Sequence, residues 1–428
     1  MVKVVHLTAH LGGGVGRALS GVAETANKNF EHSFVCLEKP EKSQFVELIE
    51  QKGCEVFQMP DQHRLLSILR NADIVQVEWW NHPVLLGCLA RLPELKMRLV
   101  IWCHVSGLHT PVIPESLLTL AHRFVFTSIA SLQAEAVRKH YDIVKSKLAV
   151  IPSCGGFKEF PEPASISALT TQALSAGYVG SMNFAKLHPD FIAYLSAVSL
   201  PNFRVRMVGD TTNQALLQMQ CDRQGKSKLL VFDGYHEDVA TTLGSINTLV
   251  YLLNPFHYGT TENALLEAMA MGIVPIVMNN PVESRIVQNG VTGLVVDNQT
   301  EFADAVLWLS EHPKARAEMA HAAAHHVRMT YSSDTLQAAF KGLYQDVMDI
   351  GKSQINFENV FGKTPAEWFL SCQKQPEIFG CDGQISLTGM ASDYGLFELS
   401  KGSVRHFRGV FSEDTQIKQW AKKLDSMT

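Results

Sequence analysis

The feature that most constrains this chain is a repeated alternation of short apolar runs with longer stretches of helical spacing. The runs are rich in β-branched and aromatic residues and almost continuously hydrophobic, as buried parallel strands are. In the first part of the sequence we predict strands at Val4–Thr8, Ser33–Leu37, Val56–Met59, Ile74–Val77, Leu99–Cys103, Phe124–Thr127 and Leu148–Ile151. Helices are predicted between them, over 17–28, 42–52, 64–71, 82–91, 114–122 and 131–140. Such a pattern predicts an α/β fold with a doubly wound parallel sheet.

The alternation stops and then starts again. Residues 155–175 carry several Gly and Pro and no strand pattern, so we interpret them as an interdomain linker. Strands are then predicted at Ala176–Val179, Arg204–Val208, Leu229–Phe232, Thr248–Leu252, Ile273–Val277 and Gly293–Val296, with helices over 188–198, 212–224, 236–244, 261–271, 281–288, 301–310, 313–329 and 333–350. The sequence therefore predicts two Rossmann-like domains, 1–154 and 176–350, facing a central cleft where ligands bind. Residues 351–428 are expected to form an appendage that ends in an amphipathic helix over Thr415–Leu424.

Composition excludes several classes of protein. Of the 428 residues, 46% are hydrophobic and 18% charged, which is typical of a globular chain, and the net charge of -5 argues against nucleic acid as the main partner. No apolar run approaches the roughly 20 residues of a membrane span. The start, VVHLTAH, is typical of a strand rather than a signal peptide, and the eight Cys form no CxxC pair. We therefore expect a cytoplasmic protein. The Lys and Arg residues of 351–428 also allow peripheral contact with the inner face of a membrane, although a solvated face is the simpler interpretation.

The first candidate binding motif is LGGGVGR over 11–17, between a predicted strand and a predicted helix. Gly13 and Gly14 allow the backbone to approach an anion closely, and the helix that follows offers unpaired N–H groups. Arg17 adds a cation that can contact a phosphate. The spacing is neither that of the dinucleotide fingerprint nor that of a P-loop. The alternative is a tight turn without a ligand.

The second candidate is the start of the helix predicted over 261–271. Threonines are good N-cap residues, and the free N–H groups of a first helical turn can hold a phosphate. The residues expected to form this site are Thr260, Thr261, Glu262, Asn263 and Ala264. Glu267 lies about two turns in, on an otherwise apolar helix, so its carboxylate must be paired or bind a ligand such as a ribose diol. The alternative for Glu267 is a position on the solvent face.

The run LLEAMAMGIVPIV, followed by NGVTGLVV, resembles the donor-binding signature of the family-4 retaining glycosyltransferases (glycosyl transferases group 1). The resemblance covers residues 1–350 and is specific over 250–297. It implies the two-domain GT-B fold and transfer from a nucleotide-diphosphate sugar with retention, without a bound metal or cofactor. A UDP-sugar is slightly favoured, because uridine is commonest among such donors. In the family the second Glu of a Glu-x7-Glu pattern contacts the ribose, and it maps to Glu267.

The sequence departs from the family pattern at two positions. The first Glu of the pattern maps to Gly259, and we expect Glu262 or Asn263 to compensate. The family also has Gly-Arg followed by a Lys, and both cations grip the diphosphate. Here the corresponding residues are Gly180, Ser181 and Lys186, so one cation is missing and Arg17 is expected to replace it across the cleft. Because an ammonium stabilises the charge of a leaving diphosphate, Lys186 is the expected electrostatic catalyst. The alternative is a solvated loop lysine.

Other candidates follow predicted strands. His104 resembles a strand-end His of the family that faces the transferred sugar, and we expect it to act in the catalytic site; the alternative is a structural His. The loop Phe232-Asp233-Gly234-Tyr235 resembles the turn that lines the nucleobase pocket in the family, so Tyr235 is expected there. The segment 78–82, Glu-Trp-Trp-Asn-His, is proposed for the acceptor, since aromatic faces pack on sugar rings. The alternative is that both Trp belong to the core.

The sequence thus predicts a hexose-type glycosyltransferase of glycan or glycoconjugate biosynthesis, with a carbohydrate, lipid-linked or protein acceptor. It predicts no metal constellation, and we name no general base. Three alternatives remain: a catalytically degenerate nucleotide-sugar-binding or scaffold protein, a nucleotide-sugar epimerase, and a glycogen-synthase-like polymerase. A dehydrogenase is disfavoured, because no dinucleotide fingerprint is present.

Overall fold

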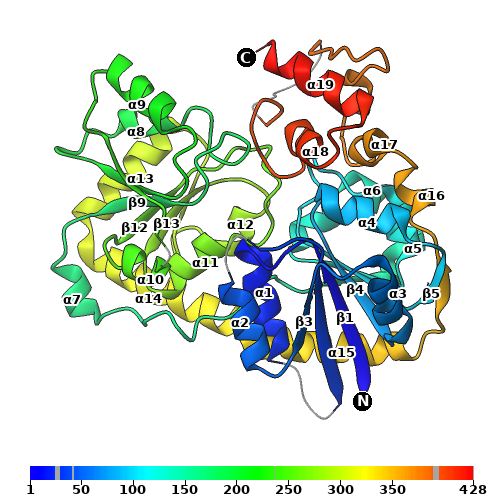
Figure 1. Cartoon of the computed structure of the whole chain (residues 1–428). Coiled ribbons are helices and arrows are strands. Elements are labelled where there is room, and N and C mark those ends of the chain that lie inside the picture. The colour runs from blue at the N-terminus through cyan, green and yellow to red at the C-terminus, as the bar shows by residue number, and fades with distance from the viewer. Residues whose placement is uncertain (25–28, 41–42, 237, 389–394, 428) are drawn as a thin grey trace. The chain divides into compact units, whose positions relative to one another are not determined.

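A computed structural model describes residues 1–24, 29–40, 43–236, 238–388 and 395–427 of the chain (Figure 1). The chain divides into two compact units. Unit 1 comprises Met1–Gly155, Tyr258–Thr261 and Ser333–Thr428, and unit 2 comprises Gly156–His257 and Glu262–Ser332. No helix in these described ranges is both long and apolar enough to cross a bilayer.

Unit 1 is built on a parallel sheet of seven strands in the order β3-β2-β1-β4-β6-β7-β8. The strands are β1 (Val2–Thr8), β2 (Phe30–Cys36), β3 (Glu55–Gln58), β4 (Ile74–Trp79), β6 (Leu99–Cys103), β7 (Arg123–Phe126) and β8 (Leu148–Val150). All seven predicted strands of this half are confirmed. The order reverses direction at β1, whose neighbours are β2 and β4, so the sheet is doubly wound and the crevice for ligands is expected where these strands end.

The crossover helices of unit 1 begin and end close to the predicted positions. They are α1 (Gly13–Ala23), α2 (Gln44–Gln51), α3 (Gln62–Asn71), α4 (Pro83–Arg91), α5 (Glu115–Leu120) and α6 (Glu135–Val144). Local chemistry explains the boundaries: the Asp61 side chain caps α3 by accepting a hydrogen bond from Arg64 N, and Pro83 stands at the first turn of α4. The helix predicted over 17–28 starts earlier, and its last residues, 25–28, lie outside the described residues.

Helix α15 (Ser333–Met348) lies in unit 1, which corrects the predicted second domain of 176–350. Its apolar side chains recur at helical spacing, and Phe340 and Tyr344 are buried in the same core cluster as Phe34 and Trp102 of the first sheet. The ring of Phe340 packs edge-on against that of Trp102 at 4.7 Å. A helix with one apolar stripe must bury it against some sheet, and the sequence does not state which one.

Residues 351–428 are part of unit 1 rather than an appendage. Strand β15 (Ser353–Ile355) pairs antiparallel with β5 (Leu95–Met97), and both strands were missed because three residues are too few to show periodicity. The helices are α16 (Glu358–Phe361), α17 (Pro365–Leu370), α18 (Val404–Val410) and α19 (Thr415–Asp425). The predicted amphipathic end is confirmed as α19, which buries Ile417, Trp420 and Leu424 in the core of unit 1.

Unit 2 holds the second parallel sheet, of six strands in the order β11-β10-β9-β12-β13-β14. The strands are β9 (Ala176–Val179), β10 (Val205–Val208), β11 (Leu230–Gly234), β12 (Thr248–Tyr251), β13 (Val274–Met278) and β14 (Leu294–Val296). The helices are α7 (Ile166–Thr170), α8 (Phe191–Ala197), α9 (Gln214–Arg223), α10 (Val239–Leu243), α11 (Asn263–Ala270), α12 (Glu283–Ile286), α13 (Gln299–Glu311) and α14 (Pro313–Thr330). All six predicted strands are confirmed.

The segment expected as a linker belongs to unit 2 and contains one short helix. Residues from Gly156 onward cluster with that unit, and helix α7 forms within the segment. Arg328 of α14 binds it by donating hydrogen bonds to the backbone oxygens of Phe160 (2.8 Å) and Pro161 (3.0 Å). The Gly and Pro residues of the segment therefore mark turns packed on α14 rather than a free connection.

Candidate functional site

In unit 2 the loops after β9 and β12 lie side by side at the carboxyl edge of the sheet. Strands β9 and β12 are neighbours in that sheet. The two loops are joined by backbone hydrogen bonds from Asn254 N to Lys186 O (2.8 Å) and from His188 N to Leu252 O (3.0 Å). Since α11 follows the second loop, Lys186 is held close to the residues that lead into that helix.

Lys186 forms an ion pair with Glu262, the N-cap residue of α11. Its Nζ lies 2.9 Å from Oε2 of Glu262, and the lysine side chain is 22% exposed while that of Glu262 is 3% exposed. The Tyr251 hydroxyl donates a hydrogen bond of 2.6 Å to the same carboxylate oxygen. From the family resemblance we expected Lys186 to lie near the start of this helix. In the structure Lys186 contacts Glu262 there, within unit 2.

Two further residues extend this pair into a buried chain of alternating charges. His257 Nε2 lies 3.1 Å from Glu283 Oε1, and its Nδ1 lies 3.9 Å from Glu262 Oε1. Burial alone would lower the pKa of His257, but the carboxylates of Glu283 and Glu262 outweigh it and raise that pKa. Burial likewise opposes ionisation of Glu262, but Lys186 and His257 prevail and lower its pKa. The chain Glu283, His257, Glu262, Lys186 therefore alternates acidic and basic side chains.

The start of α11 differs from the prediction. The helix begins at Asn263, and its N-cap residue is Glu262, whose side chain makes no capping hydrogen bond. Thr260 and Thr261 instead belong to unit 1, where their hydroxyls contact the loop after β7. Thr260 Oγ1 lies 2.8 Å from Thr127 Oγ1, and Thr261 Oγ1 donates to Thr127 O at 3.0 Å. Their role as helix caps was wrong because long-range partners bind both hydroxyls.

Gly180 and Ser181 follow β9 directly and sit against the end of β10. Gly180 and Gly209 lie in close contact, because a Cβ on Gly209 would lie 1.9 Å from Gly180 O. The φ values are +153° for Gly180 and +151° for Gly209. The Ser181 hydroxyl accepts a hydrogen bond from Asn183 Nδ2 (2.7 Å), and Asp210 accepts one from Met182 N (3.1 Å). This turn thus presents backbone and neutral polar groups where the resembled family has an arginine.

The remaining predicted residues of unit 2 lie on α11 and after β11. Glu267 is 9% exposed, so the solvent-face alternative for this carboxylate is wrong. Asn263 has a buried Oδ1 without a hydrogen-bond partner in the described part of the chain. Ala264 is half-buried in the first turn. Tyr235 follows β11 and is 60% exposed.

The glycine-rich motif of unit 1 forms the turn that the sequence predicts. Gly12 is extended and precedes α1, which begins at Gly13, where φ is +58°. Gly13 and Gly14 are exposed and Arg17 is half-buried. The first N–H groups of an eleven-residue helix therefore face solvent after the central strand β1.

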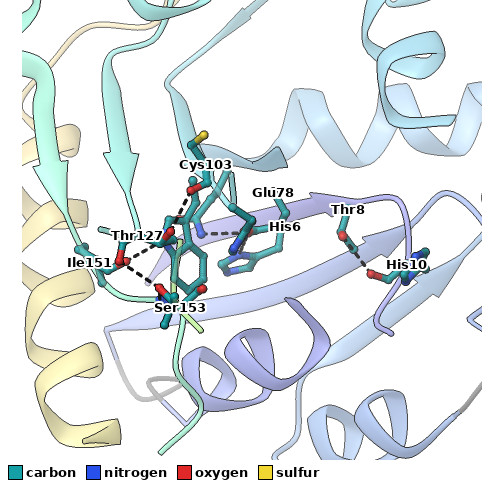
Figure 2. Close-up of polar contacts among 12 residues, drawn as sticks. His6, Thr8, His10, Glu78, Cys103, Thr127, Ile151 and Ser153 are labelled. Atoms are coloured by element: carbon teal, nitrogen blue, oxygen red, sulfur yellow. Dashed lines mark hydrogen bonds and ion pairs between the residues drawn. The ribbon is translucent and has the colours of Figure 1, made fainter. Parts of the chain in front are cut away.

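His104 is engaged inside unit 1. Its Nε2 lies 2.9 Å from Oε2 of Glu78, a carboxylate with no exposed surface. The other oxygen of Glu78 lies 3.0 Å from His6 Nδ1 and accepts a hydrogen bond of 2.9 Å from Gln76 Nε2. Figure 2 shows Glu78 and His6 pointing toward each other from neighbouring strands.

These contacts correct the expectation for residues 78–82. Glu78 and Trp79 are completely buried, so neither can meet an acceptor sugar, and for Trp79 the core alternative holds. Trp80 is half-buried, and the edge of its ring lies against His10 and His104, with centroids 5.6 and 6.2 Å apart. Only the middle of this segment keeps an aromatic surface near the carboxyl edge.

His10, Glu38 and His82 also meet at the carboxyl ends of β1, β2 and β4, close enough in space to hold a metal ion. The surrounding groups do not suit one. His10 Nδ1 accepts the N–H of Gly12 at 2.9 Å, whereas an imidazole bound through Nε2 normally donates from its other nitrogen. Nζ of Lys401 also lies 3.0 Å from His10 Nε2. The cluster is better described as a polar contact between these loops and the C-terminal segment.

Sequence reasoning missed the buried partners. No motif pointed to His257, Glu283 or Tyr251. A polar Tyr in a buried strand and a His in the loop after it nevertheless indicate that polar partners are needed. His6 and Gln76 carried a usable signal, because each is a polar residue inside an otherwise apolar predicted strand, and such groups are paired when buried. Glu78 directly follows the second of these predicted strands and was assigned to the acceptor segment instead.

Comparisons with known proteins agree with this architecture. Residues 173–312 match the family model described as glycosyl transferases group 1. HepE of Anabaena, solved with UDP, is 18% identical, with a TM-score of 0.61 over 81% of this chain and 100% of that one. Sucrose-phosphate synthase of Thermosynechococcus elongatus is 15% identical, with a TM-score of 0.59 over 82% of this chain and 100% of that one. TarM is 9% identical, with a TM-score of 0.63 over 82% and 99%.

No curated protein matches the chain in sequence. At these identities the solved structures establish the fold, and the matched segment contains β9, Lys186, α11 and most of unit 2. The chain therefore has the fold of the GT-B glycosyltransferases, and its residues 173–312 match the glycosyl transferases group 1 family.

Proposed function

We infer that this chain is a glycosyltransferase that moves a hexose-type sugar from a nucleotide-diphosphate sugar to an acceptor hydroxyl, with retention, in glycan or glycoconjugate biosynthesis. The observation that carries this proposal is the contact of Lys186 with the start of α11, inside the segment that matches glycosyl transferases group 1. An ammonium at 22% exposure beside a helix amino end suits a diphosphate leaving group.

Several features support a UDP-sugar as the donor and unit 2 as the unit that binds it. HepE of Anabaena has been solved with UDP and with UDP-glucose. In this chain Glu267 is a buried carboxylate on the helix that carries the site, as a ribose diol requires. No bound metal or cofactor is part of the proposal, since Lys186 and the helix amino end carry the positive charge.

The first test is donor binding. Thermal shifts are measured for the whole chain with UDP, GDP and ADP, because a ligand at 100 times its dissociation constant stabilises by about 2.7 kcal/mol. We expect UDP to give the largest shift, and UDP-glucose to be consumed when acceptors are added. NMR of the product then shows whether its anomeric configuration is retained.

The second test uses two variants and a control. Lys186→Ala is expected to lower kcat by about 10²–10³-fold, as loss of one charge-stabilising group does. Glu267→Ala is expected to weaken UDP binding by about 10-fold or more, because a hydrogen bond to a charged group contributes about 1.5–3 kcal/mol. Lys314→Ala, whose lysine side chain is 78% exposed, is the control and should behave as wild type. Wild-type turnover in both site variants would refute the assignment.

A second candidate is a nucleotide-sugar-binding protein without catalysis. Gly259 and Ser181 stand where the resembled family has two charged residues. In addition, the ammonium of Lys186 is already paired with the Glu262 carboxylate. Such a protein would bind UDP yet show neither transfer nor slow hydrolysis of the donor. Tight UDP binding without any release of glucose from UDP-glucose would favour this candidate.

A further inference from the structure

Unit 2 contains a buried pair of titratable side chains beside the proposed donor site. His257 lies in the loop after β12 and is 5% exposed, and Glu283 begins α12 after β13 and is completely buried. Strands β9, β12 and β13 are neighbours in the second sheet, so the loops that follow them lie along one carboxyl edge. The pair is therefore close to the loop that carries Lys186, although it takes no part in the donor contacts proposed above.

Glu283 depends on His257 for its polar contact. Nε2 of His257 lies 3.1 Å from Oε1 and 3.3 Å from Oε2 of Glu283, and no other polar side chain among the described residues contacts this carboxyl group. A bare carboxylate without exposed surface is costly, because burial removes its hydration. Burial therefore favours the form of the pair that has no net charge.

The pair has no net charge when it holds two protons. Glu283 is then either ionised beside an imidazolium or a carboxylic acid that donates to a neutral imidazole. In both forms Nδ1 of His257 carries an N–H, which faces Oε1 of Glu262 at 3.9 Å. When one proton leaves, the other lies on Nε2 against Glu283. The pair is then negatively charged, and Nδ1 turns a lone pair toward Glu262.

Glu262 transmits this change to Lys186. Its Oε2 contacts the ammonium at 2.9 Å and accepts the Tyr251 hydroxyl at 2.6 Å, while its Oε1 faces His257. An N–H at Nδ1 takes up part of the carboxylate charge, so the ammonium remains available to an anion. Without that proton, the cluster gains a negative charge in a buried place, where charges are weakly screened. The groups that face His257 are thus Glu283 from α12, Glu262 from the start of α11 and Lys186 from the loop after β9.

The same three acidic and imidazole groups lie close enough together to hold a metal ion. The surrounding donors do not suit one. Glu262 already accepts from the Tyr251 hydroxyl and contacts the ammonium of Lys186, which would repel a cation. The cluster is better explained as one that holds a proton.

We propose that Glu283 is a positioning residue for the diphosphate of the donor. By holding a proton on His257 beside Glu262, it keeps the charge of Lys186 available to that diphosphate. This proposal rests on the proposed function and makes donor binding depend on one proton. Burial lowers the pKa of His257, but the carboxylates of Glu283 and Glu262 outweigh it and raise that pKa. The proton is therefore retained to a higher pH than on a free imidazole, and it is lost as the pH rises further.

The first test measures the affinity of the whole chain for UDP-glucose by calorimetric titration between pH 6 and pH 8.5. The diphosphate of this probe stays fully ionised in that range, so a change in affinity reports on the protein. We expect the wild-type dissociation constant to rise about tenfold toward pH 8.5, which corresponds to a rise of one unit in the pKa of the pair when the donor binds. An affinity that is constant, or that increases with pH, would overturn the proposal.

Glu283→Gln identifies the group that titrates. The amide keeps the shape of the side chain but removes its negative charge, so burial prevails and His257 stays neutral throughout this range. The variant should keep the wild-type affinity of pH 6 at every pH, and at pH 8.5 it should bind about tenfold more tightly than wild type. A purely structural role predicts weaker binding at every pH instead. Weaker binding throughout, or a fall with the wild-type midpoint, would contradict the role of Glu283.

Glu115→Gln is the matched control. Glu115 also contacts an imidazole, His140 Nε2 at 2.8 Å, but at the surface of unit 1. This variant should follow the wild-type affinity at every pH.

Proton uptake is an independent readout that needs no variant. Titrations in buffers with different ionisation enthalpies give the number of protons bound with UDP-glucose. Near the midpoint of the affinity change, wild type should take up a fraction of a proton and Glu283→Gln none. If Glu283→Gln does not fold, the wild-type measurement still decides, because binding without proton uptake would overturn the proposal.

Two kinds of failure can be told apart. If UDP-glucose binds at no pH, the proposed function fails together with its link to the pair. If it binds with an affinity that does not change with pH, only the role of Glu283 fails. NMR of ¹⁵N-labelled imidazoles, assigned with His257→Gln, checks the proton itself in the ligand-free protein. Nδ1 of His257 should be protonated at pH 6 and unprotonated at pH 8.5, and the same state at both values would overturn the proposal.

Discussion

At the scale of single residues, the proposed donor site depends on how Lys186 is held. Its ammonium is fixed by Glu262, and Glu262 is fixed in turn by the Tyr251 hydroxyl and by His257. A lysine side chain is otherwise flexible, and ordering it costs conformational entropy. The buried partners order the lysine during folding, so a diphosphate bound at the proposed site would meet a side chain that is already in position.

The charge chain predicts a pH-dependent stability. His257→Gln removes one cation between two buried carboxylates and should destabilise the protein by about 3–5 kcal/mol. The pKa of His257 is raised in the folded protein, so its contribution is fully present below the unfolded value of about 6.5 and is lost as pH rises through the folded value. Urea unfolding from pH 6 to pH 9 should therefore show the largest difference from wild type at the acidic end.

The control for this experiment is His325→Gln, because His325 is an exposed histidine of the same unit. Its difference from wild type should be small and should not change with pH. A difference for His257→Gln that grew toward pH 9 would mean that the imidazole is neutral in the folded protein.

At the scale of elements, the proposed donor site depends on close packing where β9 and β10 end. The loops that follow these two neighbouring strands approach each other so closely that the residue at the contact cannot carry a side chain. Gly209 and Gly180 satisfy this condition, since Gly180 O occupies the place of a Cβ on Gly209. Ser181 and the loop to Lys186 start from this contact.

Gly209→Ala should therefore displace the turn at Gly180. Its Cβ would lie 1.9 Å from Gly180 O, and its φ of +151° adds backbone strain of about 1–3 kcal/mol. We expect UDP affinity to fall more than tenfold, as measured by calorimetric titration. Gly244→Ala is the control, because Gly244 has a φ of -60° and its nearest atom would be 3.4 Å away. Unchanged affinity in Gly209→Ala would remove this turn from the binding site.

At the scale of the whole molecule, the order of the chain is not the order of its units. The C-terminal residues from Ser333 return to unit 1, where α17, α18 and α19 add Trp368, Phe407 and Trp420 to its core. The last 96 residues are thus part of the same compact unit as the first 155 residues of the chain. Unit 2 has a sheet and helices of its own between these segments.

Trp420→Ala tests this organisation. The side chain is 1% exposed, packs on Phe379 at 5.3 Å, and donates a hydrogen bond to Gly380 O at 2.9 Å. Its removal should cost about 3–5 kcal/mol. In scanning calorimetry the transition of unit 1 should fall by about 10 °C.

The same scan supplies the control. Trp308→Ala truncates a tryptophan of unit 2 that is 38% exposed, and it should leave the unit 1 transition in place. A Trp420→Ala protein that melts as wild type does would show that α19 is not part of the core of unit 1.

Much of the fold was readable from local pattern. The thirteen strands of the two parallel sheets were all predicted, because a strand buried on both faces needs a continuous apolar run that can be read without its neighbours. The nearness of Lys186 to the start of α11 was expected from the family resemblance, and the pairing of β9 with β12 explains it, since adjacent parallel strands bring their following loops to one edge.

The sequence by itself thus determined the two sheets, the helices between them and the location of Glu267 on one of those helices. Tertiary structure alone decided that α15 covers the first sheet, that the Thr260 and Thr261 hydroxyls bind Thr127, and that Glu78 is enclosed by His6 and His104. The physical reason is that periodicity states which groups must be buried or paired, whereas the partner, often more than 70 residues away, is selected only when the chain packs.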